Sequence, residues 1–116
     1  MVEGLWTLEF RSSIGNTGYG TVTLSEGRAT GGTAGYFYMG RYRVEGDVLS
    51  ASLKVRRFNE QNISVFGPLI EFELRLSGTV AEPRMILAGR VVSHPDLKIV
   101  VVCTKCEDIS EGMLDK

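Results

Sequence analysis

The chain has 116 residues, 43% of them hydrophobic, and its 13 basic and 14 acidic side chains leave a net charge of −1. This length fits a single domain that buries roughly two-thirds of its unfolded surface without needing a disulfide or a metal ion. The near-neutral charge argues against a duplex-binding module, and the apolar content argues against a disordered chain. We therefore expect a globular protein with no direct nucleic-acid partner and no membrane partner.

Alternation of apolar and polar residues begins at residue 4, where Trp6, Leu8 and Phe10 share one face. Thr7 and Glu9 lie on the other face, a pattern typical of a strand with one buried side. The same period recurs between turn-forming residues. Strands are predicted over residues 4–11, 19–25, 28–33, 36–44, 48–58, 70–80, 85–92 and 98–105.

The predicted strands are short and mostly joined by hairpins, and no segment has a convincing amphipathic helical pattern. Such a chain forms an up-and-down antiparallel barrel or a sandwich. We favour the eight-stranded barrel, because closure removes the strand edges that a flat sheet would expose. We expect one barrel domain over residues 1–106 and a flexible C-terminal tail over residues 107–116. The first seven residues lack a basic segment before an apolar run, so we expect no signal peptide and a cytoplasmic location.

Few residues suggest catalysis or metal binding. Cys103 and Cys106 form a lone C-x-x-C, without the further ligands that a zinc site needs. We expect a buried Cys103 beside an incidental Cys106. His94, the only histidine, is placed in a turn and has no evident nucleophile to activate. We therefore predict no enzymatic activity, no cofactor and no metal.

Basic side chains gather in two predicted strands, at Arg41 and Arg43 and at Lys54, Arg56 and Arg57. Lys54 and Arg56 alternate on one strand face, which would line up with an RNA backbone. The favoured interpretation is a solvated face screened by Glu71 and Glu73.

The predicted barrel interior contains several large apolar side chains. In small barrels an N-terminal tryptophan such as Trp6 plugs one end, often beneath an arginine that stacks on the indole. An eight-stranded barrel has room for packed side chains or for one small ligand. The candidate ligand-binding residues are Trp6, Leu8, Phe10, Tyr36, Tyr38 and Leu74.

The last two predicted strands are apolar on both faces, although a barrel wall needs only one apolar face. A contiguous exposed apolar patch marks a protein interface more often than a free surface. We therefore expect a homodimer whose interface includes Ile86, Ala88, Val92, Val100 and Val102.

Three segments resemble the GrlR-like family: 4–12, Gly20-Thr21-Val22, and Gly31-Gly32 before Tyr36-Phe37-Tyr38-Met39-Gly40. The resemblance covers approximately residues 1–66. It implies a lipocalin-like barrel that is dimeric, cytoplasmic and non-enzymatic. The regulator that names this family represses type III secretion genes in enteric bacteria by binding a transcriptional activator protein, and not DNA. Its barrel has an apolar cavity, and an acidic surface turn is implicated in partner binding. The matching turn here keeps carboxylates at Glu45 and Asp47.

Two functions follow from these observations. In the first, a regulatory protein sequesters a partner, such as a transcriptional activator, through Glu45 and Asp47. In the alternative, the barrel carries or senses a small apolar molecule in its interior.

Overall fold

The computed structural model describes residues 2–59 and 69–108. These residues contain strands and connecting turns but no helix. The strands are β1 (Gly4–Ser12), β2 (Thr17–Ser25), β3 (Arg28–Gly32), β4 (Tyr36–Glu45), β5 (Val48–Arg57), β6 (Glu71–Thr79), β7 (Arg84–Val91) and β8 (His94–Glu107).

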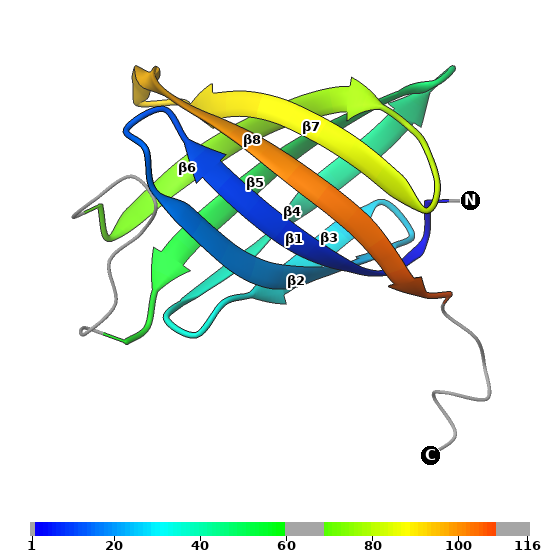
Figure 1. Ribbon diagram of the computed structural model, residues 1–116, viewed down its shortest axis with the longest axis horizontal. Helices are drawn as coiled ribbons and strands as arrows, with labels where there is room; N and C mark the ends of the chain where they lie inside the picture. The colour runs from blue at the N-terminus through cyan, green and yellow to red at the C-terminus, as the bar shows by residue number, and fades with distance from the viewer. Residues whose placement is uncertain (1, 60–68, 109–116) are drawn as a thin grey trace.

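The strands form one closed barrel, in which each strand pairs antiparallel with its neighbours in the sequence. Closure is completed by β1, which pairs with β2 on one side and with β8 on the other. Figure 1 shows β8 and β1 crossing one side of the barrel, with β4 and β5 behind them. The predicted eight-stranded up-and-down antiparallel barrel is therefore confirmed, and it is consistent with a lipocalin-like architecture.

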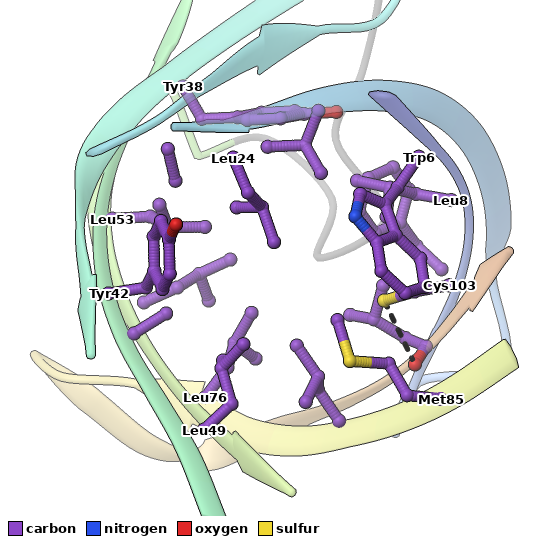
Figure 2. Close-up of a pocket in the computed structure, with 17 residues that line it drawn as sticks. Trp6, Leu8, Leu24, Tyr38, Tyr42, Leu49, Leu53, Leu76, Met85 and Cys103 are labelled. Atoms are coloured by element: carbon purple, nitrogen blue, oxygen red, sulfur yellow. Dashed lines mark hydrogen bonds between the residues drawn. The ribbon is translucent and has the colours of Figure 1, made fainter. Parts of the chain in front are cut away.

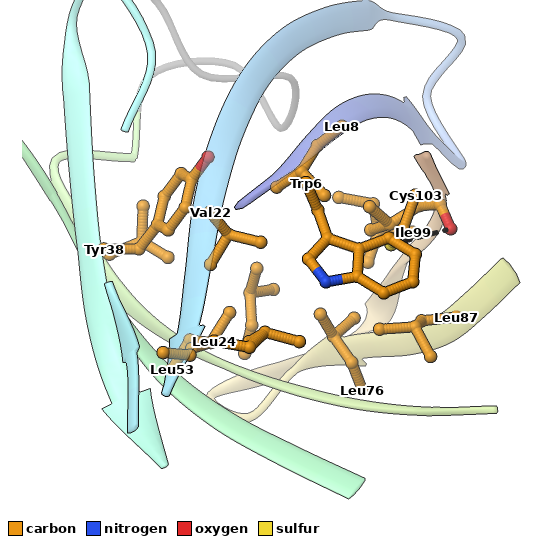
Figure 3. Packing of buried hydrophobic residues seen from close by; sticks show 14 of the residues in the cluster. Trp6, Leu8, Val22, Leu24, Tyr38, Leu53, Leu76, Leu87, Ile99 and Cys103 are labelled. Atoms are coloured by element: carbon orange, nitrogen blue, oxygen red, sulfur yellow. Dashed lines mark hydrogen bonds between the residues drawn. The ribbon is translucent and has the colours of Figure 1, made fainter. Parts of the chain in front are cut away.

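The core follows the alternation of the sequence, because successive side chains of a strand point to opposite faces. Trp6 is fully buried in this core, close to Leu76, Leu87 and Cys103 (Figure 3). None of the buried side chains in the described part of the chain is polar or charged. The barrel interior is thus a hydrophobic core, whose burial is the main contribution to stability.

The hairpin between β2 and β3 illustrates how turn chemistry fixes register. Ser25 pairs with Arg28, so the connection has only two residues. Both of them, Glu26 (φ 52°) and Gly27 (φ 78°), have positive φ. Positive φ at both central positions gives the turn the twist of the flanking strands.

The structure differs from the sequence prediction at both ends of β8. The turn lies at Val92 and Ser93, not over Ser93–Asp96 as predicted, because the strand begins at His94, which pairs directly with Val91. A register shift between Arg90 and Val91 accommodates the short connection. At the other end β8 includes Glu107, which belongs to the predicted tail. The rest of that tail, from residue 109, lies outside the described residues, as does most of the predicted loop at 59–68.

Candidate binding sites

The barrel interior encloses a cavity of about 50 Å³, lined by 17 residues from both halves of the barrel wall (Figure 2). Trp6 and Leu8 lie on one side and Tyr42 and Leu53 on the other. Ligand pockets for drug-sized molecules generally measure 300–1,000 Å³. The side chains themselves therefore fill most of this barrel, and the remaining space suits only a very small apolar group.

Five of the six predicted ligand-binding residues line this cavity: Trp6, Leu8, Phe10, Tyr38 and Leu74. Tyr36 is buried but is not part of the lining. Its hydroxyl donates a hydrogen bond to the carbonyl oxygen of Leu69 at 2.8 Å. Met85 and Leu87 also line the cavity, although they are not among the predicted ligand-binding residues. Their signal was present, since both occupy inward positions of an alternating strand.

Tyr38 is held in place by backbone groups. Its hydroxyl donates to the carbonyl oxygen of Thr21 at 2.6 Å, and the carbonyl oxygen of Gly32 lies 3.3 Å away. A Cβ atom on Gly20 would lie 2.7 Å from this hydroxyl, so glycine is needed there. Burial raises the pKa of Tyr38 far above its usual value, which keeps the hydroxyl protonated as a donor. Gly20, Gly32 and Tyr38, which belong to the segments that resemble the GrlR-like family, therefore pack against one another.

The two cysteines lie on opposite faces of β8. Cys103 points into the core, where burial raises the pKa of its thiol to about 12, whereas Cys106 is exposed. Both thiols are free. The predicted burial of Cys103 is confirmed. A thiol with so high a pKa is a poor nucleophile.

Lys105 closes the end of the barrel beneath which Trp6 lies. Its Nζ atom is 5.9 Å from the centroid of the indole ring, and the indole N–H donates to the carbonyl oxygen of Val2 at 2.8 Å. The cation over the tryptophan is therefore a lysine, where small barrels often have an arginine. Lys105 also pairs with Glu82 at 2.8 Å and with Asp108 at 2.6 Å. Desolvation lowers its pKa, but these hydrogen bonds outweigh that effect and raise it overall.

Glu45 and Asp47 lie on the hairpin between β4 and β5, at the same end of the barrel as Lys105. Glu45 forms an exposed ion pair with Arg43 at 3.0 Å. Gly46 adopts a φ of 63°, which a glycine accommodates without strain. The structure therefore places both predicted partner-binding carboxylates on an exposed turn, at the positions that flank Gly46.

Four of the five predicted interface residues lie together on the outer face of β7 and β8. Ile86 pairs with Val102, and Ala88 pairs with Val100. These four residues are called the β7–β8 face below. Ile86 is 56% exposed and Val100 is 40% exposed. Val92 is also exposed, but it lies in the connection between the strands, beyond the Arg90–Lys98 pair.

The only histidine, His94, has its Nδ1 atom 2.8 Å from Oγ of Ser93, on the exposed connection between β7 and β8. Across residues 2–59 and 69–108, no three His, Cys, Asp or Glu side chains are grouped so as to hold a metal ion. Within the same ranges, no helix has the length and apolar character needed to cross a membrane. No family model matches this chain, and no curated protein matches it either.

Proposed function

We propose that this chain is a non-enzymatic regulatory protein that acts by binding another protein, as its resemblance to the GrlR-like family implies. The observation that carries the proposal is the contrast between the two sides of the barrel wall. Side chains fill the interior except for a cavity of about 50 Å³, whereas aliphatic side chains on β7 and β8 are exposed. A surface of this kind suits contact with a protein better than the interior suits a cargo.

A second copy of the chain is the proposed occupant of the β7–β8 face. The face is flanked on the β1 side by Glu9 and Arg11, which pair with each other at 2.6 Å. An apolar centre inside a charged rim is the usual anatomy of a protein interface. Because a two-fold axis uses the same patch on both subunits, one apolar face is sufficient to form a homodimer.

The dimer is tested by sedimentation equilibrium of Val100→Lys against the matched variant Val48→Lys. Val48 is 44% exposed, close to the 40% of Val100, but it lies on β5. We expect a dimer for the wild type and for Val48→Lys, and a monomer for Val100→Lys. A wild-type monomer, or a dimer that withstands Val100→Lys, contradicts this part of the proposal.

The partner is proposed to be a transcriptional activator held through Glu45 and Asp47. Both carboxylates lie at a tight exposed turn, where charge reversal does not disturb the core. The test compares the proteins retained from a lysate of the source cells by the wild type and by Glu45→Lys/Asp47→Lys. We expect a DNA-binding regulator to be retained by the wild type and lost by the variant. Retention that does not depend on these two residues contradicts their proposed role.

The alternative function, a carrier or sensor of a small apolar molecule, rests on the apolar lining of the cavity. Native mass spectrometry distinguishes the two proposals. A bound molecule that leaves on denaturation would favour the carrier, and a protein without added mass would favour the regulator.

A further inference from the structure

Two aromatic side chains stack on the outer surface of the barrel, on the side opposite the β7–β8 face. Phe37 lies on β4 between the buried Tyr36 and Tyr38, so it points outward, and Phe58 follows the end of β5. Their ring centroids are 6.3 Å apart, with 26° between the planes. Phe58 is 60% exposed and Phe37 is 38% exposed. The pair thus offers an aromatic surface to the solvent that the core does not use.

Three arginines that form no ion pair within the described residues lie beside this aromatic pair, although register places Glu71 directly across from Arg56. Register places Arg56 directly across from Phe37, and Arg28 directly across from Arg41. Among the residues that the structure describes, no carboxylate forms an ion pair with any of these three arginines. By contrast, three other basic side chains of β4, β5 and β6 each form an ion pair with a glutamate. These are Arg43, Lys54 and Arg75, at 3.0, 3.7 and 3.8 Å.

Like charges directly opposite each other on neighbouring strands are destabilising. The Arg28–Arg41 pair therefore carries a cost that a bound anion would relieve. A groove of about 560 Å³ runs past the pair and is lined by Thr23, Ser25, Glu26, Arg28, Thr30 and Arg41. Its hydroxyl groups are further hydrogen-bond donors to an anion, whereas Glu26 is the one acidic side chain in the lining. A second groove, of about 470 Å³, lies on the other side of Arg41. Its lining includes Lys54 but also Glu71 and Glu73, so the first groove suits an anion better.

We propose that Phe37, Phe58, Arg28, Arg41 and Arg56 form a binding surface for single-stranded nucleic acid. Phe37 and Arg41 are four residues apart on β4, a separation of about 13 Å at the rise of a strand. The ligand must therefore be elongated and must carry both flat rings and several anionic groups. Single strands meet this description, because sequence-tolerant binding combines aromatic stacking platforms with a positively charged track. An acidic polypeptide would engage the arginines but would leave the stacked rings without a role.

The net charge of −1 does not conflict with this surface, because binding depends on local charge. The site is separate from the proposed dimer face, since β4 and β8 lie on opposite sides of the barrel (Figure 1). The nucleic-acid surface and the dimer can therefore be tested independently.

Fluorescence anisotropy with a labelled oligothymidylate of about 12 nucleotides tests the proposal, measured over a series of salt concentrations. We expect saturable binding that weakens with salt, with a slope of about −2 for three arginine contacts. Phe58→Ala should weaken binding roughly 5- to 150-fold, as the loss of one stacked base does. Phe58→Tyr keeps an aromatic ring and should bind as the wild type does. Arg41→Gln should weaken binding and reduce the steepness of the salt dependence by about 0.7.

The matched control is Arg90→Gln, which removes a positive charge on the outer face of β7 and should leave binding unchanged. Circular dichroism of each variant checks that the barrel remains folded. The proposal is overturned if no saturable binding occurs, or if Arg90→Gln weakens it as much as Arg41→Gln does. It is also overturned if polyglutamate binds equally well and Phe58→Ala has no effect, which would identify an acidic polypeptide as the ligand. Duplex DNA that binds as tightly as the single strand would overturn it as well.

Discussion

The ammonium group of Lys105 lies over the indole ring of Trp6, which pairs with it across β1 and β8. The two residues come into contact only when the barrel closes, because β1 and β8 are the first and last strands. A cation facing an indole contributes about 0.5–1 kcal/mol at exposed sites and more where it is desolvated. The interaction therefore links closure of the sheet to the sealing of one end of the core.

Gly4 makes room for this arrangement, and we expect Gly4→Ala to destabilise the protein. Its φ is 148°, and an added Cβ atom would lie 2.7 Å from Cε of Lys105 and 2.5 Å from the carbonyl oxygen of Glu107. Strain and steric overlap together should lower the free energy of unfolding by about 2–4 kcal/mol. Urea denaturation provides the measurement. Gly46→Ala is the control, because its φ is also positive but nothing lies within 4 Å of the added atom. Equal losses for the two variants would rule out a steric role for Lys105.

Gly20 and Tyr38 should behave as a coupled pair. Tyr38→Phe removes the hydrogen bonds to the backbone and should cost about 1 kcal/mol. Gly20→Ala should cost about 1–3 kcal/mol, because the new methyl group meets the Tyr38 hydroxyl. The double variant, which lacks that hydroxyl, should lose at least about 0.5 kcal/mol less than the sum of the two. Additive losses in denaturant titrations would show that Gly20 is required for another reason.

Stability should fall at alkaline pH. Burial raises the pKa of Cys103 from 9.0 to about 12 and also raises that of Tyr38. Above pH 9 the thiol ionises in the unfolded chain but not in the folded protein, which favours unfolding. The stability is therefore fully present below pH 9 and is lost as pH rises toward 12. For Cys103 alone the loss is about 1.4 kcal/mol per pH unit in this interval. Urea titrations at successive pH values should show the decline, and Cys103→Val should make it shallower. A Cys103→Val variant with an unchanged slope would rule out the thiol as a cause.

The two thiols should differ widely in reactivity. In the native protein a thiol reagent should modify Cys106 rapidly and Cys103 only after unfolding, because only Cys106 is exposed. Mass spectrometry should therefore find one modification under native conditions and two in denaturant. Rapid double modification of the native protein would show that the barrel opens at β8 more readily than its packing indicates.

The alternation of the sequence predicted most of the strands, since the two-residue period depends only on neighbouring residues. It correctly assigned Leu8 and Leu74 to the interior and Ile86 and Val100 to the exterior. It failed at His94, because the sequence Ser93-His94-Pro95-Asp96 is typical of a turn. In the structure His94 pairs with Val91 and belongs to the strand. Strand pairing overrode local propensity there.

The candidate sites depended more strongly on tertiary structure. The sequence could not show that Tyr36 would bond to Leu69 rather than line the cavity, or that the side chains would leave only about 50 Å³ empty. Nor could it place Arg28 opposite Arg41, because a shift of one residue in register would move either side chain to the other face.

The sequence by itself determined that the chain forms short strands with one apolar face, joined by tight turns and with no patterned helix, because these features are local. Only the tertiary structure decided which residues from distant strands meet, namely Trp6 with Lys105, Phe37 with Phe58, and Ile86 with Val102. The physical reason is that barrel closure and register are cooperative and non-local, so the charge and packing of each surface are settled only when all eight strands have paired.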